Sequence, residues 1–176
     1  VRLVGSEMCI RDRYGIIQFG KFKLSSGKES DYYIDMRRAL SIPVIYREVI
    51  EAMSQLVSNI DLVAGIESGG VPWAAMLAYK LGIGMIYVRK QPKEHGTSRF
   101  VEGIYTSNQR VLIIDDVMTT GSSLIRGIGL IEAAGLRAVQ AMVIVDRSGG
   151  GIDLKVPLQY VLRAEEILDE LNRINQ

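Results

Sequence analysis

The sequence predicts an α/β fold in which helices flank a central, mostly parallel sheet. Short apolar runs typical of buried strands alternate with segments of helical period, as in proteins whose parallel sheet is covered on both faces. Several of these runs end in acidic residues or glycines, at the edge where such sheets bind ligands. Length and composition agree, because 176 residues suit one domain and 48% are hydrophobic.

In the first half, strands are expected where short apolar runs are bounded by turn residues, and helices where apolar residues recur every three or four positions. Pro43 suits a first helical turn, and Gly82 suits the end of a helix. The expected elements are strands at 16–24 and 32–34, a helix at 43–57, a strand at 61–66, a glycine-rich turn at 65–70, a helix at 71–81 and a strand at 85–88.

The second half begins with residues 90–103, which are charged, contain Pro92 and show no period. We interpret them as one long loop of about fourteen residues, a length that is usually functional or disordered. The same reasoning then predicts a strand at 110–114, a helix at 124–134, a strand at 138–145, a short strand at 158–162 and a helix at 164–172.

Charge and cysteine content restrict the class of protein. The 21 Lys and Arg nearly balance 20 Asp and Glu, which does not favour a nucleic-acid binder. The single cysteine, Cys9, excludes a disulfide framework and a multi-cysteine zinc site, and it fits a reducing compartment. No apolar run reaches the roughly 18 residues of a membrane span. We therefore expect a cytoplasmic protein with neither nucleic-acid nor membrane partners.

Residues 1–13 differ in texture from the rest of the chain. They do not begin with Met, they show no regular period, and they lack the apolar segment of a secretory signal. We interpret them as a non-native leader, with a genuine N-terminal helix as the alternative reading. The functional analysis therefore rests on residues 14–176.

The most informative segment is 111–123, VLIIDDVMTTGSS. An apolar strand leads to Asp115 and Asp116, whose carboxylates suit the vicinal hydroxyls of a ribose or a metal held through water. The following small residues lead into a helix, where backbone N–H groups and hydroxyls can bind a phosphate. A plain helix cap explains one hydroxyl but not the whole pattern. The segment is neither a G-x-G-x-x-G fingerprint nor a P-loop, and it predicts a sugar-phosphate site.

A second polar group opens the long loop. Arg89, Lys90 and Lys93 are followed by His95, the only histidine of the chain. Clustered cations can neutralise a diphosphate, and a loop of this kind can close over a site and exclude water. A solvated charged loop is the alternative, but the loop follows a strand of the same sheet, so its base is expected at the ligand edge.

Four motifs, taken in order, resemble one family. Residues 111–123 resemble the phosphoribosyl pyrophosphate (PRPP) binding motif of type I phosphoribosyltransferases, and RK-x-x-K-x-HG at 89–96 resembles the catalytic loop of orotate phosphoribosyltransferase. Residues 65–70 resemble the diphosphate loop of that family, and residues 19–35 resemble its N-terminal hood segment. The resemblance covers the chain from about Gly15 to Ser148, and more loosely to its end.

The resemblance implies the type I phosphoribosyltransferase fold, with a small hood formed by the N-terminal segment. Within a single domain at 14–176, the hood is expected at about 14–40, the core at about 43–148, and a C-terminal strand and helix at about 156–174. The family usually has a helix before the Tyr14 region, and we expect that residues 1–13 stand in its place.

The resemblance also implies an activity. Orotate and PRPP would give orotidine 5'-monophosphate and diphosphate, in de novo pyrimidine (UMP) biosynthesis, with Mg²⁺ bound mainly through PRPP and no direct protein ligand. A homodimer is implied, with the loop around Lys93 and His95 shared between subunits. The alternatives are a phosphoribosyltransferase for another base and a PRPP-binding regulator on the same fold; the sequence of the loop argues against both.

Residue roles are carried over from the same resemblance. Lys93, His95, Asp115 and Asp116 are the expected catalytic residues: the two acids hold the ribose hydroxyls, and Lys93 and His95 stabilise the leaving diphosphate. The expected PRPP contacts are Arg89, Lys90, Lys93, His95, Asp115, Asp116, Val117, Met118, Thr119, Thr120, Gly121, Ser122, Ser123, Ser68 and Gly69. The expected orotate contacts are Tyr33, Ile34, Thr119 and Arg147.

Two positions depart from the family pattern, and two further readings stay open. Ile34 stands where a second aromatic residue often lies, and Ser25 stands where bacterial relatives often have a PRPP-contacting lysine. Lys23 or Lys28 could compensate for Ser25. Arg147 could form a surface ion pair instead of binding orotate. Trp73 and the methionines on helical stripes are expected in core or dimer packing.

Overall fold

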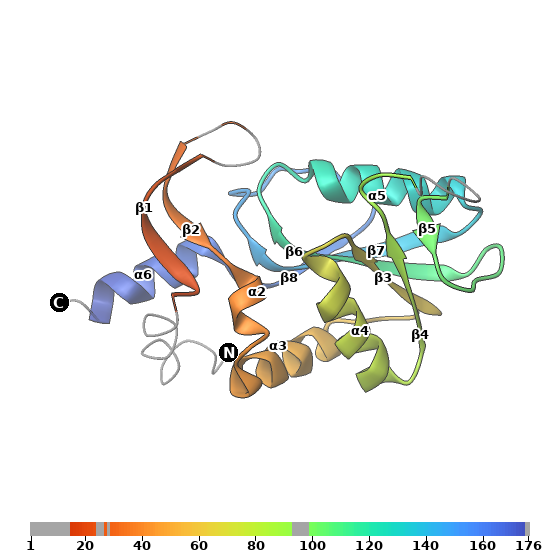
Figure 1. Ribbon diagram of the computed structural model, residues 1–176, viewed down its shortest axis with the longest axis horizontal. Helices are drawn as coiled ribbons and strands as arrows, with labels where there is room; N and C mark the ends of the chain where they lie inside the picture. The colour runs from red at the N-terminus through yellow and green to blue at the C-terminus, as the bar shows by residue number, and fades with distance from the viewer. Residues whose placement is uncertain (1–14, 24–26, 28, 93–98, 175–176) are drawn as a thin grey trace.

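The computed structural model describes residues 15–23, 27, 29–92 and 99–174, and it confirms the α/β class (Figure 1). A six-stranded sheet and a separate two-stranded hairpin are its sheet structures. No helix among the described residues has both the length and the apolar character needed to cross a lipid bilayer.

The hairpin joins β1 (Ile17–Lys23) to β2 (Glu29–Ile34), which run antiparallel with Ile17 opposite Ile34. A short helix, α2 (Met36–Ala39), follows directly, and the Asp35 side chain caps it by accepting a hydrogen bond from the Arg37 backbone N–H. Sequence periodicity does not reveal α2, because four residues are too few to show a helical repeat. The hairpin lies beside one end of the main sheet, as expected for a hood (Figure 1).

The main sheet has the strand order β5-β4-β3-β6-β7-β8, in which β5 alone is antiparallel to its neighbour. Its strands in chain order are β3 (Leu62–Ile66), β4 (Gly84–Val88), β5 (Val101–Glu102), β6 (Arg110–Met118), β7 (Arg137–Asp146) and β8 (Leu158–Arg163). Because the other five strands are parallel, their carboxyl ends meet at one edge of the sheet.

Helices cover both faces of this sheet (Figure 1). The helices α3 (Pro43–Gln55) and α4 (Gly70–Leu81) lie on one face, α5 (Ser122–Ala133) lies on the other, and α6 (Ala164–Ile174) ends the described chain. Side chains along β6 alternate accordingly: Leu112 and Ile114 pack in the cluster of α3 and α4, whereas Val111 and Ile113 pack in the cluster of α5.

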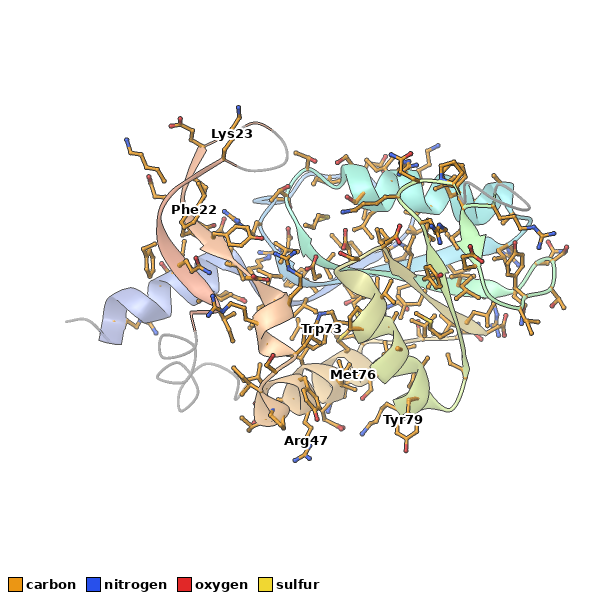
Figure 2. The ribbon with its side chains drawn as sticks, in the orientation of Figure 1. Phe22, Lys23, Arg47, Trp73, Met76 and Tyr79 are labelled. Atoms are coloured by element: carbon orange, nitrogen blue, oxygen red, sulfur yellow. The ribbon has the colours of Figure 1, made fainter. Side chains whose placement is uncertain are left out.

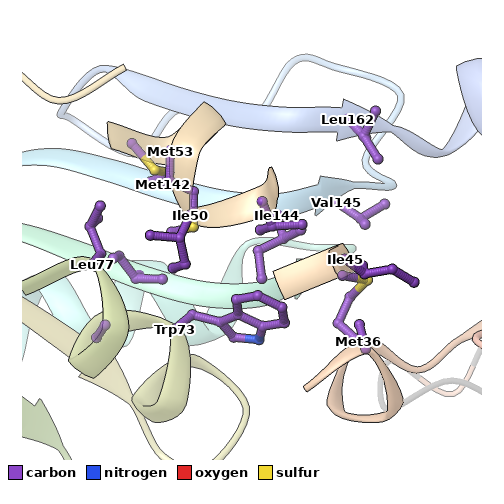
Figure 3. Packing of buried hydrophobic residues seen from close by; sticks show 14 of the residues in the cluster. Met36, Ile45, Ile50, Met53, Trp73, Leu77, Met142, Ile144, Val145 and Leu162 are labelled. Atoms are coloured by element: carbon purple, nitrogen blue, oxygen red, sulfur yellow. The ribbon is translucent and has the colours of Figure 1, made fainter. Parts of the chain in front are cut away.

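Trp73 anchors the larger of the two clusters. It extends from α4 into the interior, fully buried, beside Ile144 of β7 (Figure 3). By contrast, Arg47 of α3 and Tyr79 of α4 project outward, and Tyr79 is 90% exposed (Figure 2). Core packing, one of the two expectations for Trp73, is therefore confirmed.

Several expected boundaries were wrong. The strand expected at 32–34 begins at Glu29. The strand expected at 110–114 continues to Met118, because β6 stays paired with β7 up to Met118 and Asp146; Asp115 and Asp116 therefore lie within the strand. The helix expected from 124 begins at Ser122. The loop expected at 90–103 contains β5, whose two residues pair with Val88 and Tyr87 of β4.

Candidate active site

The candidate site is a cavity of about 370 Å³ at the carboxyl edge of the sheet, between the ends of β3 and β6 and the hairpin. Its wall is formed by seven parts of the chain: the hairpin, α2, the turn after β3, the segment after β4, the end of β6, the start of α5 and the residue after β7. Its lining residues are Lys23, Tyr33, Ile34, Asp35, Arg37, Glu67, Ser68, Gly69, Lys90, Asp115, Asp116, Val117, Thr119, Ser123 and Arg147.

The acidic pair lies at the centre of this wall. The Asp116 backbone N–H donates to Asp115 Oδ1 at 3.0 Å, and the Val117 N–H donates to Asp116 Oδ1 at 2.8 Å. Burial, together with the charge of Asp116, raises the pKa of Asp115 to about 7. The ligand-free pair therefore retains a proton over much of the acid range, and a ligand that offers hydroxyl donors or positive charge would favour the fully ionised pair.

Two glycines bring the turn after β3 against the acidic strand. A Cβ atom at Gly69 would lie 2.3 Å from Asp116 Oδ2, and one at Gly70 would lie 2.2 Å from the Ile114 carbonyl oxygen. Only residues without a side chain can approach this closely. The peptide between Glu67 and Ser68 is cis. The turn thus presents backbone, rather than side chains, beside the Asp116 carboxylate.

The turn at 119–123 leads from β6 into α5. Gly121 has φ 74°, a left-handed conformation that favours glycine, and it is the N-cap of α5. Thr120 Oγ1 donates to Ser122 Oγ at 3.1 Å. The first N–H groups of a helix have no partner within the helix and attract anions. Of this turn, Thr119 and Ser123 line the cavity, so two hydroxyl residues lie at the end where α5 begins.

Positive and negative side chains share the cavity wall. The wall includes four cationic residues and four acidic ones: Lys23, Arg37, Lys90 and Arg147, with Asp35, Glu67, Asp115 and Asp116. Arg37 Nε donates to Asp35 Oδ1 at 2.9 Å, and Arg37 Nη2 donates to the Tyr33 hydroxyl at 3.1 Å. This mixture suits a ligand that has both hydroxyl groups and several negative charges.

Arg147 joins the sheet to the hairpin. Its Nη2 donates to Ser30 Oγ at 2.9 Å, and its guanidinium lies 4.2 Å from the centre of the Tyr32 ring. Its Nε is buried, with no hydrogen-bond partner among the residues that the structure describes. Tyr33, the neighbour of Tyr32, packs against Phe22 at a ring distance of 5.6 Å. An aromatic wall and a cation therefore stand at the hairpin side of the cavity.

The structure brings most of the predicted site residues together. Those that line the cavity are Tyr33, Ile34, Ser68, Gly69, Lys90, Asp115, Asp116, Val117, Thr119, Ser123 and Arg147. Lys23 also lines it, whereas the alternative Lys28, together with Ser25, Lys93 and His95, lies outside the described residues.

Other predicted residues do not line the cavity: Arg89, Met118, Thr120, Gly121 and Ser122. The Arg89 guanidinium pairs with Glu102 at 3.6 Å and borders a neighbouring cavity, which Ser122 also lines. The Met118 side chain is buried in the α5 cluster.

Three lining residues were not anticipated from the sequence: Asp35, Arg37 and Glu67. Asp35 and Arg37 follow the hairpin directly, so a charged pair just after the aromatic strand could have indicated them. Glu67 lies inside the glycine-rich turn at the end of β3. A carboxylate is unusual in a loop that binds anions, and this could have indicated a separate role for Glu67.

Comparison with known proteins decides the family. The phosphoribosyl transferase domain family matches residues 38–170. The orotate phosphoribosyltransferase of Pyrobaculum islandicum is 44% identical over 164 residues, a match that covers 89% of this chain and 85% of that protein. The chain belongs to the orotate phosphoribosyltransferase family. This confirms the resemblance drawn from the four sequence motifs.

Solved structures support the assignment to the orotate phosphoribosyltransferases. The crystal structure of the enzyme from Aeropyrum pernix matches with a TM-score of 0.84 and 36% identity, covering 95% of this chain and 98% of that one. The Mycobacterium tuberculosis H37Rv enzyme in complex with PRPP matches with a TM-score of 0.71 and 26% identity, covering 91% and 95%. The type I phosphoribosyltransferase fold of the chain is thereby confirmed.

Proposed function

We propose that this orotate phosphoribosyltransferase transfers the phosphoribosyl group of PRPP to orotate in the cavity described above. The products are orotidine 5'-monophosphate and diphosphate, a step of pyrimidine biosynthesis. One observation carries the proposal: the acidic pair and hydroxyl-rich turn of the 111–123 motif, the glycine turn and the aromatic wall of the hood border one cavity of about 370 Å³.

The chemistry is a substitution at the anomeric carbon of the ribose. The bond from this carbon to the diphosphate oxygen breaks, and a bond to the ring nitrogen of orotate forms through a transition state with ribosyl-cation character. Orotate is already anionic at neutral pH through its carboxylate, and its ring nitrogen loses its proton to the departing diphosphate or to water as the new bond forms, so the chain need not supply a strong base. Its tasks are to position the two substrates and to stabilise the departing negative charge.

The acidic strand and the two turns each bind a different part of PRPP. Asp115 and Asp116 accept hydrogen bonds from the ribose hydroxyls, and their negative charge favours the positive character of the ribose in the transition state. The turn at 119–123 binds the 5'-phosphate through hydroxyls and helix-start N–H groups. The backbone at Ser68 and Gly69, with the Lys90 ammonium, faces the diphosphate.

Orotate binds at the hairpin side of the cavity. Tyr33 supplies a ring face for stacking, and Ile34 supplies apolar contact where a second aromatic residue is common in the family. The Arg147 guanidinium is held by Ser30 and Tyr32 and can pair with the orotate carboxylate, while Thr119 offers a hydroxyl.

The oxygen donors of the cavity fit Mg²⁺, which prefers carboxylate, phosphate and water oxygens. Within the described ranges, no group of three or more His, Cys, Asp and Glu residues could hold a metal by itself. A magnesium ion would therefore be held mainly by PRPP, with Asp115 and Asp116 nearby. When bound, it supplies positive charge that neutralises the diphosphate.

A homodimer completes the site in this proposal. Lys93 and His95 stabilise the leaving diphosphate, and the loop that contains them reaches the site of the other subunit. Both residues lie outside the described part of the chain, and their roles rest on the family resemblance of the RK-x-x-K-x-HG motif.

The test is an orotate absorbance assay with PRPP and Mg²⁺, with adenine and uracil as parallel substrates. We expect orotate to be consumed only when PRPP and Mg²⁺ are both present, and the Asp116→Asn variant to lose this turnover while retaining its circular dichroism spectrum. Consumption of adenine or uracil instead would indicate another base. Binding of PRPP without turnover of any base would indicate a regulator.

A further inference from the structure

The backbone of Lys90 is held by hydrogen bonds from two other elements. Lys90 is the second residue after β4, where the chain leaves the sheet, and it borders the active-site cavity. Its side chain is also close enough to Asp115 for its positive charge to lower the pKa of that carboxyl, against the larger effect of burial. The direction in which Lys90 leaves β4 therefore decides whether this cation faces the acidic pair.

Glu67 holds the N–H side of Lys90. Its Oε2 accepts the Lys90 backbone N–H at 2.9 Å. The Glu67 backbone is held in turn, because its own N–H donates to the Val88 carbonyl of β4 at 2.9 Å. A carboxylate in the diphosphate turn repels a negatively charged diphosphate, so direct ligand binding does not explain Glu67. Its hydrogen bond to the Lys90 N–H gives it a structural role instead.

Arg126 holds the carbonyl side of Lys90. Its Nη2 donates to the Lys90 carbonyl oxygen at 2.8 Å, and its guanidinium lies 5.4 Å from the centre of the Phe100 ring. Phe100 lies just before β5, and its carbonyl accepts the Arg89 backbone N–H at 2.8 Å. Arg126, from the second turn of α5, thus contacts Lys90, just after β4, and Phe100, just before β5.

Lys90 also borders a second cavity, of about 360 Å³, on the side of Arg126 and Arg89. A lysine with a freely rotating backbone could place its ammonium in either cavity. With its N–H bound to Glu67 and its carbonyl bound to Arg126, the Lys90 peptide groups have one orientation.

We propose that Glu67 and Arg126 are positioning residues that clamp the Lys90 backbone and direct its ammonium toward the diphosphate of PRPP. The inference rests on the proposed function for the identity of the ligand. Glu67 acts from the diphosphate turn and Arg126 from the helix that begins at the phosphate turn, so the clamp ties three PRPP-binding segments together.

The first test compares matched variants. We expect Glu67→Ala and Arg126→Met each to lower kcat/KM for PRPP by about tenfold, since a small displacement of a catalytic group has effects of at least this size. The KM for orotate should stay within about twofold, because these residues do not contact the orotate end. Glu67→Gln retains an acceptor for the Lys90 N–H and should recover most of the loss. Glu132→Ala and Arg137→Met, at exposed positions, are the controls.

The second test asks whether the two residues act through Lys90. In a Lys90→Met background, Glu67→Ala and Arg126→Met should cause little further loss, because the positioned ammonium is already absent. The same variants are titrated with PRPP and Mg²⁺ by calorimetry, so that binding is measured independently of turnover.

The outcomes are separable. Variants that match the Glu132→Ala and Arg137→Met controls in both assays would overturn the clamp. The clamp would also be overturned if Glu67→Gln lost as much activity as Glu67→Ala, a result that would point to the charge of Glu67. It would be overturned as well if Glu67→Ala and Arg126→Met caused their full losses in the Lys90→Met background. If the unmodified protein binds PRPP but turns over no base, the proposed function fails, and the order of PRPP affinities among the variants still decides the clamp.

Discussion

At the scale of single residues, the acidic pair has the most unusual chemistry in the described chain. Partial burial and the neighbouring Asp116 carboxylate raise the pKa of Asp115 to about 7, while hydrogen bonds from Arg110 lower the pKa of Asp61 to about 2. Asp61 is stabilised as an anion for structural reasons, since Arg110 Nη2 is only 2.7 Å from its Oδ1. Asp115 is instead destabilised as an anion, and this makes it responsive to a ligand.

The raised pKa of Asp115 predicts how stability depends on pH. Between pH 4 and 7 the folded protein keeps a proton on this group that the unfolded chain has lost, so the free energy of unfolding should fall as pH rises through this range. Asp61 contributes stability that is lost only below about pH 4, outside this window. Asp115→Asn should remove the effect.

Urea unfolding of the ligand-free protein, followed by circular dichroism at pH 5 and pH 7.5, measures this. We expect the unmodified protein to lose about 2–3 kcal/mol more than Asp115→Asn does between the two pH values. An equal loss in both proteins would show that Asp115 titrates normally. Asp153→Asn, a substitution at an exposed carboxyl, controls for the general effect of removing one negative charge.

Sequence reasoning could identify most site residues but not the ones that act through contacts distant in the chain. Asp115, Asp116 and the turn at 119–123 are visible because their residue types suit a ligand and follow one another directly. Glu67 and Arg126 contact Lys90 from 23 and 36 positions away, and no local pattern marks such contacts. Only the fold brings these side chains to the same backbone.

At the scale of elements, α5 shows how one helix meets two demands. Its first turn contributes Ser123 to the wall of the cavity, and its buried face packs on β3 and β6. Gly127 lies on that buried face, where an added Cβ would be 2.6 Å from Ile113 Cδ1, whereas Gly129 is exposed with nothing near it. The two glycines, two positions apart, therefore exist in opposite environments.

Alanine substitutions should separate these environments. Gly127→Ala should lower the free energy of unfolding by about 1–3 kcal/mol, because the methyl group overpacks the core against Ile113. Gly129→Ala should raise it by about 0.5–1 kcal/mol, because alanine favours an exposed helix position more than glycine does. Thermal and urea unfolding of both variants would measure the difference, and a stable Gly127→Ala variant would contradict the packing argument.

Element prediction succeeded where a pattern was long enough to repeat. The helix from Pro43 and the buried strands were predictable because their apolar residues recur with a helical or continuous pattern. The strand β5 has two residues and is defined by the pairing of Val101 with Val88. A pattern of two residues is too short to predict such a pairing. The end of β6 was predicted too early because Asp115 and Asp116 are polar, and polar residues after an apolar run are typical of the start of a turn.

At the scale of the whole molecule, the proposed dimer divides one active site between two chains. The described cavity contains the acidic pair, the turns and the aromatic wall of one subunit. The RK-x-x-K-x-HG motif would supply Lys93 and His95 from the other subunit. Defects in these two parts should therefore complement each other in a mixed dimer.

Co-expression of Lys93→Ala with Asp116→Asn tests this arrangement. Each variant alone should be nearly inactive, whereas a random mixture of subunits should recover about a quarter of the unmodified activity, since half of the dimers are mixed and each contains one intact site. The control is the sum of the two variants assayed separately. Activity no greater than that sum would show that the loop serves its own subunit.

The buried indole of Trp73 has an optical consequence. It is the only tryptophan of the chain, and its side chain is fully enclosed by α4 and the sheet. The native fluorescence of the protein should therefore be emitted from an apolar environment and move to longer wavelength when water reaches the ring. Because α4 begins at Gly70, directly after the glycine turn beside Asp116, this single emitter reports, without any label, on the part of the core that supports the substrate cavity.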